Sequence, residues 1–286
     1  MTNWALTLIL AAAVIHATWN LLNKHASGHA TFTWLVAVLS ALLYAPATIT
    51  IIEVWQIEMD FVTIGMMAGS AALHTAYFVL LNQGYRAGDL SLVYPLARGT
   101  GPLLSSLAAI AFLGERPSAV ALCGALLIIG GVVVLTTNLA QLRQSRAQDA
   151  VLYALVTGLF IAAYTLWDKQ AVSHFGIAPL VLDWGANVGR AVLLTPLAIK
   201  YSDQTIVEWR EHKYEAIAIA VLIPLSYILV LTAMSFTPVS YVAPAREISI
   251  LIGTAMGARL LAEGDTRRRL AAACAMVLGV VALAVG

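Results

Sequence analysis

The sequence predicts an all-α membrane protein of ten transmembrane helices, built as two inverted repeats of five helices each. Three observations predict this fold: an apolar composition, ten apolar segments of spanning length and an internal duplication. Hydrophobic residues are 60% and charged residues 11% of the 286 positions, whereas soluble domains carry about 25% charged residues. Because so few polar side chains could not cover a soluble surface, we expect a surrounding lipid bilayer. The net charge of +1 gives no basic surface for nucleic acid.

Ten segments are long and apolar enough to cross a bilayer, which takes about 20 mostly apolar residues per helix. Backbone groups in lipid must be hydrogen-bonded within the segment itself, so we expect helices. Only short polar stretches connect them, and the longest are 138–149 and 200–214. The expected helices cover residues 3–23, 31–52, 61–83, 89–113, 117–137, 150–168, 178–199, 214–235, 240–262 and 268–286.

The two halves of the chain repeat the same motifs in the same order. "TWNLLNKH" (18–25) matches "AYTLWDKQ" (163–170), and "SLVYPLAR" (91–98) matches "SYVAPAR" (240–246) with one residue deleted. Because five is odd, two five-helix repeats must lie in the membrane with opposite orientations, a plan that recurs in secondary transporters. The expected units are a first repeat at 1–137, a connecting loop at 138–149 and a second repeat at 150–286.

Several of these features together resemble the EamA family of the drug/metabolite transporter superfamily. They are the duplicated five-helix unit, Pro95 and Pro244 early in the fourth and ninth helices, and "LGER" (113–116) at the end of the fourth. The resemblance covers nearly the whole chain. It implies a multi-pass permease of the inner membrane that does not hydrolyse ATP, often an exporter of amino acids or other small metabolites. The sequence agrees in that it contains no GxxxxGK[ST] phosphate-binding loop.

The repeated proline motif brings charge into an apolar segment. Pro95 and Pro244 each remove one helical hydrogen bond, so we expect a helix kink at both positions. Arg98 follows the first proline, and Arg246 and Glu247 follow the second. A charged side chain at membrane depth costs about 2.5–3.5 kcal/mol on insertion scales, and it therefore faces the bundle interior or water. Two interpretations stay open: these residues line a polar cavity between the halves, or they bond carbonyl groups freed at the kinks.

Further polar and aromatic side chains lie at helical spacing in the apolar segments. His16 and Asn20 are four positions apart, and His74 and Tyr77 are three apart, so each pair shares a helix face. The expected substrate-binding residues are His16, Trp19, Asn20, His74, Tyr77, Tyr94, Arg98, Tyr164, Trp167, Tyr227, Arg246 and Glu247. A polar stripe at Asp183, Asn187 and Arg190 is expected to be structural, with its charges neutralised inside the bundle.

This lining suits a zwitterion such as a neutral or aromatic amino acid. Arginine presents a planar fork that matches a carboxylate or a phosphate. Aromatic faces accept apolar groups and ammonium ions, and Glu247 could meet an ammonium group. Organic anions of the phosphonate or sugar-phosphate type stay open as an alternative. Amphipathic cations fit less well, because they would meet two buried arginines.

Other classes of function lack their motifs. The sequence contains no HExxH or GxSxG motif, so we expect neither an enzyme nor catalytic residues. His16 and His74 have no evident third ligand, and we expect no metal and no cofactor. A channel would usually show a symmetric filter or ring of charges, and an inverted repeat around a kinked cavity suits alternating access better.

Loop charges and glycine spacing predict orientation and assembly. Loops after the odd-numbered helices carry ten basic residues, against two on the opposite side. The positive-inside rule then places both termini outside the cytoplasm. GxxxG spacing at 65/69, 185/189 and 253/257 is expected to serve packing within one protomer, which favours a monomer.

Overall fold

The computed structural model describes residues 1–23, 30–87, 90–136, 147–258 and 266–286, and in these ranges the chain is helical with no strand. The helices are α1 (Asn3–Asn23), α2 (Ala30–Val54), α3 (Phe61–Ala87), α4 (Leu90–Phe112), α5 (Ala119–Thr136), α6 (Ala147–Ser173), α7 (Pro179–Lys200), α8 (Ser202–Phe236), α9 (Val239–Arg246), α10 (Ile248–Ala258) and α11 (Thr266–Val285). The all-α class is therefore confirmed. Each expected segment corresponds to one helix, except that 240–262 is divided into α9 and α10.

The helices have the length and surface of membrane-spanning elements. In the described ranges five of them, α1, α2, α3, α6 and α8, are long and apolar enough to cross a bilayer, and parts of α4, α5 and α11 form shorter apolar helices. Large apolar side chains face outward along the bundle, among them Phe61 (98% exposed), Leu126 and Leu278. An apolar surface of this extent needs a lipid or protein environment. The chain is a multi-pass membrane protein.

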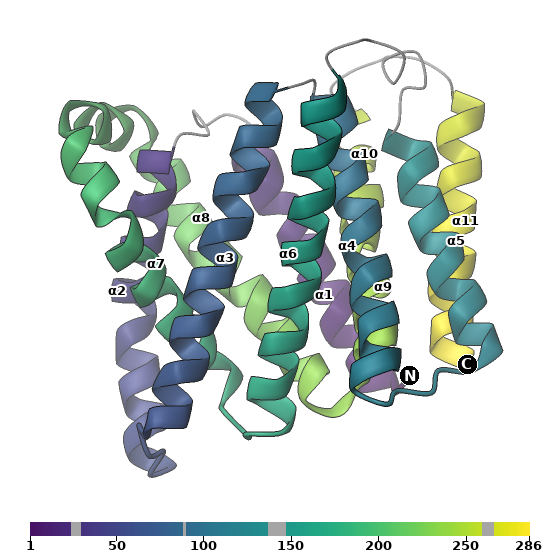
Figure 1. Ribbon diagram of the computed structural model, residues 1–286, viewed down its shortest axis with the longest axis horizontal. Coiled ribbons are helices and arrows are strands. Elements are labelled where there is room, and N and C mark those ends of the chain that lie inside the picture. The colour runs from purple at the N-terminus through teal and green to yellow at the C-terminus, as the bar shows by residue number, and fades with distance from the viewer. Residues whose placement is uncertain (24–29, 88–89, 137–146, 259–265) are drawn as a thin grey trace.

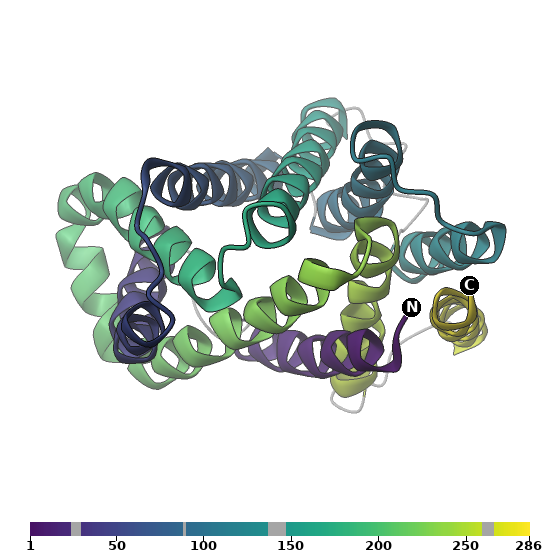
Figure 2. The ribbon, with the colours of Figure 1, turned by 90° about the horizontal axis from the view of Figure 1, so that it is seen from below.

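Helices from the first half of the chain pack against helices from the second half. In Figures 1 and 2, α5 and α11 lie together at one edge, and α2 and α7 lie toward the opposite edge. Between them α3 packs against α6, and α1 packs against α8. The two chain ends lie at the same end of the bundle (Figure 1), where the Met1 ammonium lies 3.4 Å from the carbonyl oxygens of Leu283 and Ala284.

Small residues allow the closest helix contacts, and these contacts lie within one chain. A Cβ added to Gly124 on α5 would lie 2.7 Å from the Gly279 carbonyl oxygen on α11, which is closer than real Cβ contacts. On α7, Gly185 packs against Met67 and Gly189 against Ala71, both on α3. The prediction that the 185/189 pair packs within one protomer is confirmed.

Two helices differ from their predicted form. The connection expected at 200–214 is helical from Ser202, and non-helical dihedral angles at His212 (φ −123°, ψ 25°) separate it from the rest of α8. The segment expected at 240–262 breaks at Glu247, three positions after Pro244. By contrast, α4 continues through Pro95 as one helix, so the kink expected at Pro95 stays a prediction.

Candidate functional site

A buried ionic cluster lies where α1, α4 and the α9–α10 break meet. Arg98 Nη2 on α4 lies 2.8 Å from His16 Nε2 on α1, and Arg98 Nη1 donates to Glu247 Oε1 at 3.4 Å. Arg246 Nε lies 4.0 Å from the same Glu247 oxygen. A guanidinium can only donate, so His16 Nε2 accepts and carries no proton. With His16 neutral, the cluster holds two positive charges and one negative charge.

The break between α9 and α10 places Glu247 inside the protein. Glu247 has φ −71° and ψ −7°, and its N–H bonds the Pro244 carbonyl at 3.0 Å. Its side chain is fully buried, and Arg98 and Arg246 are each only 7% exposed. Buried charges are strongly unfavourable unless they are paired. Glu247 therefore stabilises the charges of both arginines, and they stabilise its charge.

An aromatic cluster continues this network across α3, α6 and α8. Arg246 Nη2 donates to the Tyr164 hydroxyl at 3.2 Å, and the Tyr164 ring stacks on His74 with centroids 4.0 Å apart. Tyr77 and Tyr227 approach Tyr164 edge-on, with centroids 5.6 and 6.5 Å away. The structure thus brings eight predicted residues into one connected group. They are His16, His74, Tyr77, Arg98, Tyr164, Tyr227, Arg246 and Glu247.

Asp168 on α6 joins this group, although the sequence reasoning did not include it. The residue is fully buried. Its Oδ2 accepts from His74 Nε2 at 3.0 Å and from the Tyr227 hydroxyl. The predicted helix ended at Asp168, whereas α6 continues to Ser173 and so places Asp168 inside the span. Its match with Asn23 in the repeat was the available signal, since both are polar positions next to a lysine.

Several predicted residues lie at the margin or outside the group. The Trp19 ring meets His16 edge-on at 4.7 Å, and Asn20 is half-buried nearby on α1. Trp167 is 38% exposed and donates to the Met66 carbonyl at 2.9 Å, so it anchors α6 to α3 instead. Tyr94 lies on α4 one turn before Arg98, and its side chain is outside the described part of the structure.

The polar stripe on α7 forms its own chain of hydrogen bonds. Asn187 Nδ2 donates to Asp183 Oδ2 at 3.0 Å, and Arg190 Nη1 donates to Asn187 Oδ1 at 3.3 Å. Asp183 and Asn187 are buried. One amide thus lies between an acid and a base, and the neutralisation of their charges inside the bundle stays a prediction.

At the end of the bundle that carries both termini, two charged side chains hold the α8–α9 turn. The Glu115 carboxylate, from the α4–α5 connection, accepts from the N–H groups of Val239 and Ser240 at 2.7 and 2.9 Å. Lys169 Nζ donates to the carbonyls of Met234 and Thr237 at 2.6 and 3.1 Å. An acid at a helix N-terminus and a base at a helix C-terminus both complement the helix dipole. These contacts fasten the α8–α9 turn to α6 and to the α4–α5 connection.

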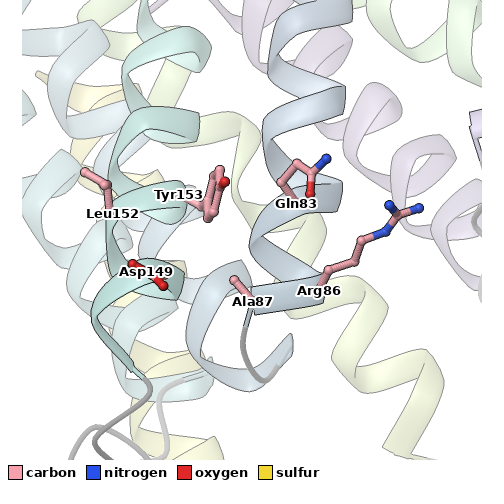
Figure 3. Close-up of a pocket in the computed structure, with 6 residues that line it drawn as sticks. All are labelled: Gln83, Arg86, Ala87, Asp149, Leu152 and Tyr153. Atoms are coloured by element: carbon pink, nitrogen blue, oxygen red, sulfur yellow. The ribbon is translucent and has the colours of Figure 1, made fainter.

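A hollow lies at the opposite end, between the end of α3 and the start of α6 (Figure 3). It measures about 450 Å³ and opens widely to the outside. Its lining residues are Gln83, Arg86, Ala87, Asp149, Leu152 and Tyr153. None of them belongs to the buried group, and Arg86 points away from α6 in Figure 3. The hollow is therefore distinct from the polar network.

Comparisons with known proteins agree with this architecture. The sequence model of the EamA-like transporter family matches residues 3–137. Twenty-nine chains of solved structures match the fold. One of them, described only as "Crystal structure of protein", superposes with a TM-score of 0.79 at 14% identity and covers 100% of this chain and 98% of its own. No curated protein matches the sequence.

The long apolar helices define a multi-pass helical membrane protein. The resemblance to the EamA family is confirmed over residues 3–137, and that match indicates a membrane transporter of the drug/metabolite transporter type.

Proposed function

We propose that the chain is a secondary transporter that exports neutral or aromatic amino acids by alternating access. The observation that carries the proposal is the buried Arg98, held by His16 and Glu247 from other helices. A guanidinium fork matches a carboxylate, and the neighbouring tyrosine and histidine rings suit an apolar or aromatic side chain. The substrate contacts in this proposal are the predicted set that surrounds Arg98.

The proposal includes ten spans in two inverted repeats, 1–137 and 150–286. Contacts between corresponding helices support the duplication. Arg98 on α4 bonds His16 on α1, and Arg246 on α9 bonds Tyr164 on α6, so each arginine reaches the first helix of its own half. Trp34 on α2 and Trp184 on α7, the second helix of each half, also reach across the α2–α7 contact in opposite directions, since Trp34 donates to Thr195 and Trp184 donates to the Ala41 carbonyl. Reciprocal contacts are expected of repeats related by a two-fold axis in the membrane plane.

Counterflow in proteoliposomes tests the function. Liposomes are loaded with unlabelled phenylalanine, leucine or threonine, and entry of the labelled compound is followed. Loss of a charge-assisted hydrogen bond of about 1.5–3 kcal/mol predicts that Arg98→Ala slows counterflow by about 10- to 100-fold. Arg210→Ala, at an exposed position on α8, is the matched control and should retain the wild-type rate. Absence of counterflow with every amino acid would contradict the proposal.

One observation favours a second candidate, an organic anion. The cluster of Arg98, Arg246 and Glu247 has an excess of positive charge, which phosphonates or sugar phosphates would neutralise. The same liposomes loaded with a phosphonate or a sugar phosphate distinguish the two. Counterflow of these anions without counterflow of amino acids would select this candidate. We further propose an inner-membrane monomer with both termini outside the cytoplasm.

A further inference from the structure

The Asp168 carboxylate, inside the aromatic cluster, has a hydrogen-bond partner for only one of its two oxygens among the described residues. Its Oδ2 accepts from His74 and Tyr227, whereas its Oδ1 has no hydrogen-bond partner among the described residues. Asp168 is fully buried. A buried carboxylate oxygen without a partner is unfavourable, and in native proteins such an atom calls for an explanation. A group that donates to Oδ1 would complete the site.

The surroundings of Asp168 favour a cationic donor. No arginine or lysine in the described ranges forms an ion pair with this carboxylate. His74 already donates to Oδ2, and its ring stacks on Tyr164. The Tyr227 ring meets His74 edge-on at 5.2 Å. A carboxylate beside aromatic rings can bind an ammonium group, through an ionic hydrogen bond and cation–π contacts.

Glu247 is the other fully buried acid of the network, and it suits a cation less well. Its Oε2 is also without a partner among the described residues. However, its Oε1 lies 3.4 Å from Arg98 and 4.0 Å from Arg246. A cation that approached Glu247 would meet two positive charges at similar distances, and like charges repel as strongly as opposite charges attract. The sequence alone had pointed to Glu247 for this role.

We propose that Asp168 Oδ1 binds the ammonium group of the transported substrate, with His74 and Tyr227 holding the carboxylate in place. The inference rests on the proposed function and narrows it to substrates that carry a primary ammonium. It also assigns separate binding roles to two parts of the network. Asp168 and its aromatic neighbours bind the cationic group, and the arginine cluster faces the carboxylate.

The test uses the full-length protein in proteoliposomes, with labelled phenylalanine and labelled 3-phenylpropionate, which lacks the ammonium group. Wild type should transport phenylalanine and discriminate against phenylpropionate. Asp168→Asn should slow phenylalanine counterflow by about 10- to 100-fold, the effect expected of one lost ionic hydrogen bond, and should reduce the discrimination. Asp203→Asn, at an exposed carboxylate on α8, should change neither.

The outcomes separate the two proposals. If wild type transports no amino acid, both the proposed function and this inference fail. If wild type transports phenylalanine and Asp168→Asn does so equally well, only the inference fails, because asparagine mimics a protonated acid and Oδ1 then holds a proton. If Asp168→Asn loses transport of both compounds equally and unfolds at a lower temperature, Asp168 has a structural role, and this result would also overturn the inference.

A second measurement needs no variant. Phenethylamine and N-acetylphenylalanine compete with labelled phenylalanine on the wild-type protein. Phenethylamine retains the ammonium group and should inhibit. N-acetylphenylalanine retains the carboxylate and ring without that charge, and should inhibit at least about tenfold more weakly than unlabelled phenylalanine, by the same ionic hydrogen bond. Inhibition by N-acetylphenylalanine as strong as that by phenylalanine would overturn the inference even if Asp168→Asn does not fold.

Discussion

The Glu115 carboxylate, which follows α4, binds the backbone of Val239 at the first turn of α9, with 2.7 Å between Oε1 and the amide nitrogen. Its second oxygen binds the Ser240 N–H at 2.9 Å. One side chain of the first half thus satisfies two N–H groups at the start of a helix in the second half. The α9 helix that it holds carries Arg246 and Glu247 at its other end.

We predict that Glu115→Gln loosens this end of the bundle. Glutamine keeps one acceptor oxygen but loses the charge and the second acceptor. We expect this to weaken the contact with the start of α9 by about 1–2 kcal/mol. That corresponds to about a 5- to 30-fold larger population of the open end. Spin labels at positions 116 and 174, in a background with Cys123 and Cys274 replaced by serine, would report a longer distance component. Glu58→Gln, exposed at the same end, should leave the distance distribution unchanged; an unchanged distribution in Glu115→Gln would contradict the prediction.

Lys169 should act together with Glu115, because both hold the α8–α9 turn. Lys169→Met removes the donor to the Met234 and Thr237 carbonyls, and we expect a loss of about 0.3–2 kcal/mol in thermal unfolding. The loss in the double variant with Glu115→Gln should differ from the sum of the two single losses by at least about 0.5 kcal/mol, as for residues that share one element. Strict additivity would show that the two side chains act on independent structures.

The ionic cluster predicts a strong effect for Glu247→Gln. Arg98 and Arg246 would then lie in the interior without their shared acid. Removal of one partner of a buried ion pair typically costs about 3–5 kcal/mol, so we expect a large fall in melting temperature. Arg246→Gln introduced into the same variant removes one of the two unpaired charges and should restore part of the stability. No recovery in the double variant would argue against electrostatics as the cause.

The α5–α11 contact predicts opposite effects for two glycines on one helix. Gly124→Ala would place a Cβ 2.7 Å from the Gly279 carbonyl oxygen, and overpacking of this kind costs about 1–3 kcal/mol. Gly130 has no atom within 4 Å of an added Cβ. Gly130→Ala should therefore be neutral or stabilise by up to about 1 kcal/mol through helix propensity. Thermal unfolding in detergent micelles compares the two, and equal effects would contradict the packing argument.

Hydropathy predicted the helices well, because spanning length and apolar composition are local properties of the sequence. Hydropathy missed the helix break at Glu247 and the burial of Asp168, because both depend on contacts with distant parts of the chain. The break at Glu247 coincides with its contact with Arg98, 149 positions away. The predicted helix ended at Asp168, whereas hydrogen bonds from His74 and Tyr227 make the burial of Asp168 tolerable. Helical spacing shows which residues share a face, but not which helix that face meets.

The shortness of α9 has a consequence for regulation. Its eight residues span about 12 Å, with the Glu115 contact at one end and the Arg246–Glu247 pair at the other. Because α9 is a single helix of two turns, we expect a displacement of one end to move the other end as well. Any compound whose affinity for the arginine pair differs between the closed and open forms must therefore change the free energy of closure by the same amount, and closure must change its affinity reciprocally. We therefore expect a ligand of the arginine pair to change the strength of the Glu115 contact.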